Sequence, residues 1–310
     1  MANPGTPTFD QLQLFLAVVE EGSFAGAARR SNRAVSAVSY GIANLEAQLG
    51  LTLFDREGTR KPQLTEAGQA MLADACAVSA SVSALRARAK GMLEGLEAQV
   101  GLAVDVMLPS ERLARILRRF ADEYPTVTLR LHVEALGAIS AAVLDGSASI
   151  GLSGPLSDDI PSLDTVAAGM VTMVPVAAPG HPLALLDPIP IGAARDQVQL
   201  VLTDRSKTTE GRDFSVISSR TWRLADLGAK HALLCEGIGW GNMPLEMIAP
   251  DLASGRLVRL ALPDHTGGIY RLSGIWRSDT PPGPAGAWLM RQFVEAGRVD
   301  LPGPHAVPAA

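Results

Sequence analysis

The sequence predicts an α/β protein with an N-terminal all-α winged helix-turn-helix and one long linker helix. Three observations support this: helix signals and a hairpin pattern up to residue 68, an apolar heptad repeat over 71–96, and alternating strand and helix signals from 97 onward. Such alternation indicates a mostly parallel sheet with helical crossovers. We expect domain boundaries of 1–65, 66–96 and 97–301, with a frayed tail at 302–310.

Apolar spacing and cap residues predict the first two helices. One apolar face, with i, i+3, i+4 and i+7 spacing, holds Leu12, Phe15, Leu16 and Val19. Gly22 suits the left-handed cap that ends this helix. Ser23 is a typical N-cap for a second helix, from residue 24 to about 30.

A third helix is predicted at about 34–49, between a polar turn and Gly50. Its buried face is expected to hold Val38, Ile42, Leu45 and Leu49. Its opposite face holds Val35, Ser36, Ser39, Tyr40 and Ala43. Residues 51–54 and 62–64 then indicate two short strands around a glycine turn. Helix, helix, turn, helix and hairpin together form a winged helix-turn-helix.

A long helix is predicted to run from its N-cap, Thr65, to about Gly95. Apolar residues recur along it at alternating spacings of four and three, an a/d pattern typical of a coiled coil. This seam consists of Met71, Ala75, Val78, Val82, Leu85, Ala89, Met92 and Leu96. The polar opposite face favours pairing with a second chain, and packing of the helix on its own domain is the alternative.

The composition is that of a soluble globular protein, with 47% hydrophobic and 19% charged residues. No run approaches the roughly 18 apolar residues of a membrane helix. The N-terminus has neither the basic nor the apolar region of a secretion signal, so we expect a cytoplasmic protein without a membrane partner. Cys76 and Cys235 lie outside any metal-binding spacing, so we expect two buried small side chains and no thiolate metal site.

The charge distribution limits how the N-terminal part binds a partner. Residues 1–95 hold nine basic and nine acidic side chains, so the rest of the chain carries the whole net charge of −5. Binding to nucleic acid therefore cannot depend on a large basic patch. It requires a few well-placed cations and helix N-termini.

A family resemblance is carried by one continuous stretch of the chain, residues 9–68. Its residues are Ser23–Arg30, Ser36–Ser39, Ile42, Leu45-Glu46, Leu49–Leu51, Leu53-Phe54, Arg56 and Leu64–Gly68. In this order they resemble the LysR-type transcriptional regulators. More loosely, Arg119-Phe120, Tyr124-Pro125 and 179–183 are similar to the effector-binding domain of that family.

The resemblance implies a sequence-specific DNA-binding transcription regulator controlled by a small-molecule effector. It implies a periplasmic-binding-protein-like effector domain with two subdomains, about 97–174 with 266–300, and 175–265. The effector would bind between them and, by closing them, change the angle between paired linker helices and the DNA bend. Expected partners are double-stranded DNA, an effector (a carboxylate is one candidate), a second chain in a dimer or dimer of dimers, and RNA polymerase as a further candidate.

Two other function classes fit the sequence less well. A solute-binding protein would share the α/β domain, but it has no use for residues 9–68 or for the heptad seam. An enzyme with an appended helix-turn-helix is disfavoured because the five histidines are scattered and no catalytic motif appears. We therefore expect no enzyme activity, no cofactor and no metal.

Base contacts are expected from the first half of the third helix, and phosphate contacts from the turn and the wing. The predicted DNA-binding residues are Arg33, Val35, Ser36, Ser39, Tyr40, Arg56, Arg60 and Lys61. The family usually has Ser, Gln and a cation where this chain has Ala34, Val35 and Tyr40. The helix cap is thus expected to shift to Asn32 or to be missing, at about 1 kcal/mol. Val35 suits a thymine methyl, and Arg56 could instead pair with Glu46 or Asp55.

The effector site is expected in a crevice beyond the C-terminal ends of the strands. The candidate residues are Leu108, Ser110, Leu136, Gly137, Thr203, Asp204, Asn242 and Met243. Ser110 at a helix N-terminus would suit a carboxylate, and simple N-capping is the alternative. Residues 203–207 form either a pocket loop or an ordinary surface loop. The glycines at 237, 239 and 241 are a weak nucleotide-binding signal.

Overall fold

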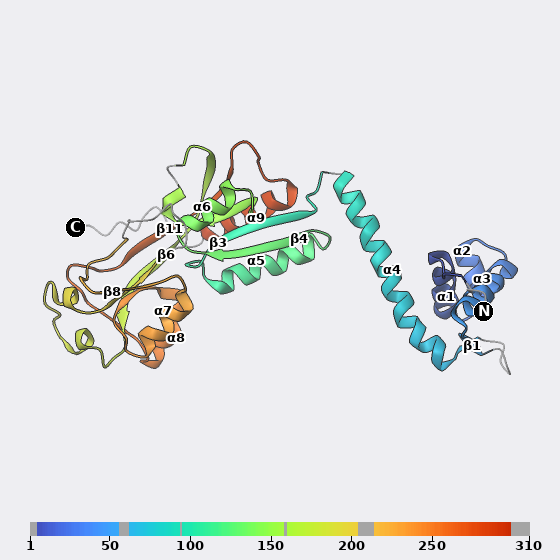
Figure 1. Cartoon of the computed structure of the whole chain (residues 1–310), viewed down its shortest axis with the longest axis horizontal. Helices are drawn as coiled ribbons and strands as arrows, with labels where there is room; N and C mark the ends of the chain where they lie inside the picture. Colours follow the sequence, from blue (N-terminus) through green and yellow to red (C-terminus); the bar gives the residue numbers. More distant parts are fainter. Residues whose placement is uncertain (1–4, 56–61, 94, 158–159, 204–213, 299–310) are drawn as a thin grey trace. The chain divides into compact units, whose positions relative to one another are not determined.

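The structure, a computed structural model, describes residues 5–55, 62–93, 95–157, 160–203 and 214–298. The chain divides into two compact units, Met1–Lys90 and Gly91–Ala310. Apart from a short hairpin, the described part of the first unit is helical, whereas the second combines a seven-stranded sheet with helices (Figure 1). The further division of the second unit into two subdomains stays a prediction.

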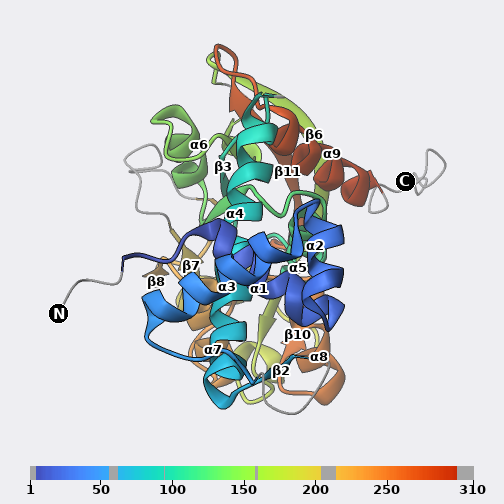
Figure 2. The same ribbon diagram turned by 90° about the vertical axis from the view of Figure 1, so that its right-hand side faces the viewer.

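Three short helices pack against one another in the first unit: α1 (Phe9–Glu21), α2 (Phe24–Ser31) and α3 (Val35–Leu49) (Figure 2). Side chains satisfy the free backbone N–H groups at the start of the first two. Thr8 and Gln11 form a capping box on α1, and the Ser23 hydroxyl accepts from the Gly26 N–H at 3.0 Å. All three predicted helices are confirmed, and Gly22 and Gly50 end α1 and α3 in the left-handed conformation.

The buried face of α1 differs from the predicted one. Its buried residues are Gln11, Leu14, Phe15 and Val18, whereas three of the predicted four (Leu12, Leu16, Val19) lie at the margin of the core. Both α2 and α3 pack on α1, so its covered surface is wider than one apolar stripe. Phe15 also packs edge-to-face on Phe54, with ring centroids 5.5 Å apart. The buried face of α1 therefore includes the side that contacts the hairpin.

The hairpin follows α3, as predicted. Strand β1 (Phe54–Asp55) pairs antiparallel with β2 (Gln63–Leu64). The Glu46 carboxylate of α3 accepts from the backbone N–H groups of Leu53 (2.8 Å) and Phe54 (3.2 Å), which attaches the hairpin to the helix. Thr65 caps the next helix, α4 (Glu66–Leu93), because its hydroxyl accepts from the Gly68 N–H at 2.9 Å.

The apolar seam of α4 divides into two parts. Ala75 is only 3% exposed, and it packs with Met71 in the core of the N-terminal unit. Packing on the helix's own domain therefore holds for the first two turns. Beyond them, Val78 is 42% exposed, Leu85 66% and Met92 58%, although they continue the same heptad spacing.

Helix α4 corrects the expectation that no segment has the length and composition of a membrane helix. An 18-residue window within it has a mean hydropathy of 1.3 and is 6% buried. Its small alanines and serines with few charges produce this value without any long run of large apolar residues. Length and composition alone are weak evidence for a membrane, and the heptad spacing of its exposed residues suits a partner helix.

The seven-stranded sheet of the second unit has the order β10-β6-β11-β5-β3-β4, with β9 also paired to β6. Strand β3 (Gln99–Asp105) is parallel to β4 (Thr128–Glu134) and β5 (Ile150–Ser153). All other pairs in this sheet are antiparallel, so the predicted mostly parallel sheet is wrong. The reason is that β6 (Leu163–Ala177) is a 15-residue strand, along which β11 (Gly268–Arg277) returns in the opposite direction.

Helices cover both faces of the β3–β4–β5 part of the sheet. Alternation along β3 directs Leu102 and Val104 into a core with α5 (Ser110–Glu123) and α9 (Pro284–Arg298). Ala103 instead packs in a core with α6 (Gly137–Leu144). Strands β3 and β4, together with α5, α6 and α9, are labelled in Figure 1.

The remaining half is built on the far end of β6. Its parallel pair is β7 (Gln199–Leu202) and β8 (Thr221–Leu224), followed by α7 (Leu227–Cys235), β9 (Gly241–Pro244), α8 (Leu245–Ser254) and β10 (Val258–Arg259). The sequence did not predict β8, β9, α8 or β10. Pro244 at the N-cap position and Pro250 inside the helix obscure the pattern of α8, because proline usually breaks a helix beyond its first turn. Helix α7 begins at Leu227, because the Asp226 side chain accepts from the Ala229 N–H and caps it.

Candidate functional site

The first candidate site is the solvent-facing side of α3. Val35 is 48% exposed and Tyr40 is 70% exposed, while Ser36 and Ala43 are exposed and Ser39 is half-buried. The predicted division of this helix into a buried and an exposed face is confirmed. The contacts of these residues with DNA stay a prediction.

The start of α3 has no side-chain cap. Ala34 occupies the N-cap position without a side-chain hydrogen bond, and Asn32 is instead the left-handed C-cap of α2, with φ of 52°. The predicted missing cap is thus the alternative that holds. No side chain caps the backbone N–H groups of Val35 and Ser36 at the start of α3, and a DNA phosphate is a suitable acceptor for them.

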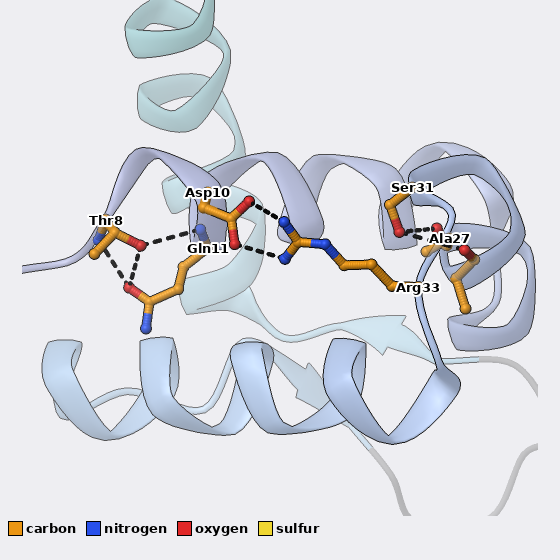
Figure 3. A network of polar contacts seen from close by, with 7 residues as sticks. Thr8, Asp10, Gln11, Ala27, Ser31 and Arg33 are labelled. Carbon is orange, nitrogen blue, oxygen red and sulfur yellow. Dashed lines mark hydrogen bonds and ion pairs between the residues drawn. The ribbon is translucent and has the colours of Figure 1, made fainter.

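The guanidinium of Arg33 is paired within the N-terminal unit (Figure 3). It donates two hydrogen bonds of 2.7 Å to the two carboxylate oxygens of Asp10, and this contact raises the pKa of Arg33. Its predicted phosphate contact would compete with this bidentate pair. Three further predicted DNA-binding cations, Arg56, Arg60 and Lys61, lie outside the described residues.

The second candidate site is a cavity of about 150 Å³ in the second unit. Its wall includes residues that follow β3 and β4, part of β7, and residues of α7, β9 and β11. Among the lining residues are Met107, Leu136, Gln199, Lys230, Asn242 and Tyr270. The described lining residues contain one cation, Lys230, and no carboxylate.

Lys230 is a buried cation, with only 4% of its surface exposed. Burial lowers its pKa to about 8, because the charged ammonium loses its hydration. Its Nζ donates to the backbone carbonyl of Asn242 at 2.8 Å. An ammonium carries three N–H donors, so it can offer further hydrogen bonds to a ligand in the cavity.

Behind the wall, Asp105 connects the ends of three strands. Its carboxylate accepts from the Tyr270 hydroxyl (2.6 Å) and from the Met107 N–H (2.9 Å), as well as from the N–H groups of Leu136 and Gly154. Burial nevertheless raises the pKa of Asp105 to about 6. The cavity wall at Met107, Leu136 and Tyr270 is thus held by one buried carboxylate.

Substitution of Gly154 by alanine tests this arrangement. A Cβ at Gly154 would lie 1.9 Å from the Tyr270 hydroxyl oxygen, so the tyrosine must leave Asp105. We expect a loss of about 2 kcal/mol in the free energy of unfolding, measured by thermal or urea denaturation. Gly180→Ala is the matched control, because a Cβ at Gly180 would have no atom within 4 Å. Equal stability of the two variants would contradict the contact between Tyr270 and Asp105.

The predicted effector residues are only partly brought together. Leu136 and Asn242 line the cavity. Ser110 is exposed as the first residue of α5, with Pro109 at the N-cap position, so the alternative that it caps this helix is wrong. Asp204 lies outside the described residues. Four others do not line this cavity: Leu108, Gly137, Thr203 and Met243.

Sequence reasoning missed Lys230, Gln199 and Tyr270. Lys230 had a usable signal, because it lies between Leu227 and Leu234 at helical spacing and therefore on the apolar face of α7. A lysine on such a face is buried at a cost, which often marks a functional site. Tyr270 had no such signal, since its partner Asp105 is 165 residues away.

Comparison with known proteins assigns a family to both parts of the chain. Residues 9–69 match the family model described as bacterial regulatory helix-turn-helix protein, lysR family, and residues 94–298 match the LysR substrate binding domain. The regulator AceR of Acinetobacter baumannii is 26% identical over 91% of this chain and 94% of its own length. The regulator PunR of Escherichia coli K12 is 28% identical, over 81% and 82%.

The fold is also that of solved full-length regulators. LysG from Corynebacterium glutamicum, determined with bound effector Arg, aligns with a TM-score of 0.50 and 21% identity, over 94% of this chain and 98% of its own. A winged helix-turn-helix joined to an effector-binding α/β domain defines a DNA-binding transcription regulator. The chain belongs to the LysR family of transcriptional regulators, and its relatives are regulators rather than enzymes.

Proposed function

We propose that the exposed side of α3 reads the operator through Val35, Ser36, Ser39 and Tyr40. The observation that carries this proposal is the exposure of Val35 (48%) and Tyr40 (70%) on a helix whose other side is fully buried. An apolar Val35 suits a thymine methyl in the major groove, and the Tyr40 hydroxyl suits a phosphate or base edge. The operator is therefore specific to this chain rather than shared with relatives that carry other residues here.

Tyr40→Ala is expected to weaken binding to a footprinted operator about tenfold while leaving binding to random DNA nearly unchanged. The measurement is a fluorescence-anisotropy titration on both DNAs at one salt concentration. Gln13→Ala, an exposed change on α1, is the control and should bind as the native protein does. An equal loss on both DNAs would contradict base reading by Tyr40 and indicate a phosphate contact instead.

We further propose that the effector is a small anion bound in the cavity at Lys230. The single cation in the described wall, without any lining carboxylate, favours a negatively charged ligand. Ser215 also lines this cavity. The side-chain amides of Gln199 and Asn242 are hydrogen-bonded within the protein, to the backbone of residues 215–218 and to His265 respectively, so Lys230 is left as the main ligand-binding group. The volume, about 150 Å³, is below the roughly 300–1,000 Å³ of a pocket for a drug-sized ligand, so the cavity suits only a small metabolite.

The pH dependence of effector binding follows from Lys230. In the free protein its pKa is about 8, and a bound anion raises it, so the affinity is greatest below pH 8 and falls as the pH rises through that value. We expect the dissociation constant of the anion to increase about tenfold per pH unit above this pKa. A small anionic metabolite is first selected by thermal shift. Isothermal titration calorimetry then measures its dissociation constant at pH values on both sides of the Lys230 pKa of about 8. A dissociation constant independent of pH would contradict the role of Lys230.

Assembly and cellular context belong to the same proposal. We propose that α4 pairs with α4 of a second chain through Val78, Val82, Leu85, Ala89 and Met92, giving a dimer or a dimer of dimers. Contact with RNA polymerase and a cytoplasmic location are expectations from the family. Footprinting with polymerase added tests the first, and fractionation of cells tests the second.

A further inference from the structure

Three potential metal ligands lie together on α7 and α8. His231 and Cys235 are one helical turn apart on α7, and Asp251 faces them from α8. Their ligand atoms all lie within 4.8 Å of one another. The cluster contributes no residue to the wall of the effector cavity, although Lys230 precedes His231 on the same helix. A pair at i and i+4 places both side chains on one face of a helix.

The distances within this cluster resemble those of a zinc site. His231 Nε2 lies 3.6 Å from Cys235 Sγ and 2.6 Å from Asp251 Oδ2. Zinc bonds of about 2.0–2.1 Å to nitrogen and 2.3 Å to sulfur, at a tetrahedral angle, separate these two donors by about 3.5 Å. The sulfur and nitrogen already have this separation. The carboxylate oxygen needs to withdraw by about 0.7 Å to exchange its hydrogen bond for a metal bond.

The surroundings orient the ligands and leave access from solvent. Arg256 Nε donates to Asp251 Oδ1, so the other oxygen, Oδ2, is directed at His231. Such outer hydrogen bonds fix the ligands of metal sites. The Asp251 side chain is 4% exposed, whereas that of His231 is 22% exposed. An ion can therefore reach the cluster from the His231 side and retain a water there.

We propose that His231, Cys235 and Asp251 bind one thiophilic divalent transition-metal ion, such as Zn²⁺, with a water in the fourth position. One carboxylate, one imidazole and one thiolate form a mixed donor set that Zn²⁺ and Co²⁺ accept. On binding, the thiol proton leaves to solvent and the Sγ–metal bond forms. In the free protein the imidazole proton lies on Nε2, which donates to Asp251. On metal binding that proton moves by way of solvent to Nδ1, so that Nε2 can bind the ion. The alternative is that the Asp251 carboxylate only joins α7 to α8 through His231 and Arg256.

Cobalt titration of the full-length protein tests the proposal directly. We expect one Co²⁺ per chain, a thiolate-to-cobalt charge-transfer absorption, and displacement of that absorption by Zn²⁺. Cys235→Ser should abolish the absorption and weaken Zn²⁺ binding by more than the roughly 10- to 100-fold typical of an outer-shell change. Cys76→Ser is the matched control and should keep the full signal, because Cys76 is an exposed thiol on α4 rather than the buried side chain that the sequence predicts.

The other two ligands keep the test independent of one substitution. His231→Gln and Asp251→Asn should each weaken Zn²⁺ binding in calorimetry, while binding by the native protein releases about one proton, from the thiol. Circular dichroism in chelator establishes that each variant is folded before titration. Absence of the cobalt absorption in the native protein, or its persistence in Cys235→Ser, would overturn the proposal in favour of a structural ion pair.

Discussion

Val82→Asp is expected to convert the protein into monomers. In a pair of α4 helices Val82 occupies a seam position, so the change places a charge from each chain within the apolar contact. Such a juxtaposition costs several kcal/mol, and the dimer should dissociate at concentrations where the native protein remains paired. Because a dimer binds two half-sites at once, we also expect operator affinity to fall by about 100-fold or more.

Ser83→Asp is the matched control for this experiment. It adds the same charge one residue away, at an exposed position on the polar side of α4, and it should remain dimeric. Light scattering gives the mass, and circular dichroism verifies that both variants keep their helices. An unchanged mass for Val82→Asp would contradict pairing through α4 and leave the exposed Leu85 and Met92 in need of another partner.

Lys230→Met is expected to have two opposite effects, on stability and on ligand binding. The folded-state pKa of Lys230 is about 8, against 10.5 for an ordinary lysine, so the buried ammonium costs about 3 kcal/mol at neutral pH. Methionine removes that cost but leaves the Asn242 carbonyl without its donor. We expect the effector-free variant to be more stable by about 2 kcal/mol near pH 7.

The pH dependence distinguishes this explanation from better packing by methionine. Because the folded-state pKa of Lys230 is lowered, the cost of the ammonium disappears as the pH rises from about 8 to about 10.5. The native protein should therefore approach the variant in stability over that range. Urea denaturation at several pH values measures this, and a constant difference in stability would contradict the explanation.

The same variant should lose the effector. Removing one partner of a buried ion pair typically costs about 2–5 kcal/mol, so anion affinity should fall by at least about 30-fold. Higher stability combined with lost binding is typical of a binding site that keeps a buried charge, at a cost in stability, because ligand binding requires it. Retained affinity for the anion would place the effector elsewhere.

Local signals predicted the N-terminal unit well, because its helices begin and end at residues with a clear preference for helix-capping positions. Ser23, Gly22 and Gly50 act within one helical turn, and Thr65 caps α4 as expected. The error in α1 has a tertiary cause: Leu14 and Val18 are buried by α2 and α3, whose positions the spacing within α1 does not reveal. Likewise, Ala75 joins a core that the heptad pattern assigned to a second chain.

The effector cavity was harder to predict because contacts distant in sequence build it. Asp105 and Tyr270 meet across the β3 and β11 ends, and the long β6 brings both halves of the domain into one sheet. The sequence suggested that Ser110 binds a carboxylate of the effector, since it lies at the start of a helix. The structure places Ser110 at the surface and Lys230 in the cavity wall. Cys235 was expected to be an inert buried side chain, and its neighbour Asp251 comes from a helix that the sequence did not predict.

An anion at Lys230 is proposed to control how this regulator binds DNA. Footprinting of the native protein and of Lys230→Met on the same operator, with and without the selected anion, tests it most directly. We predict that the anion changes the extent of the native footprint, while the footprint of Lys230→Met is the same in both conditions. A native footprint unaffected by an anion that demonstrably binds, or an equal response in Lys230→Met, would contradict the claim.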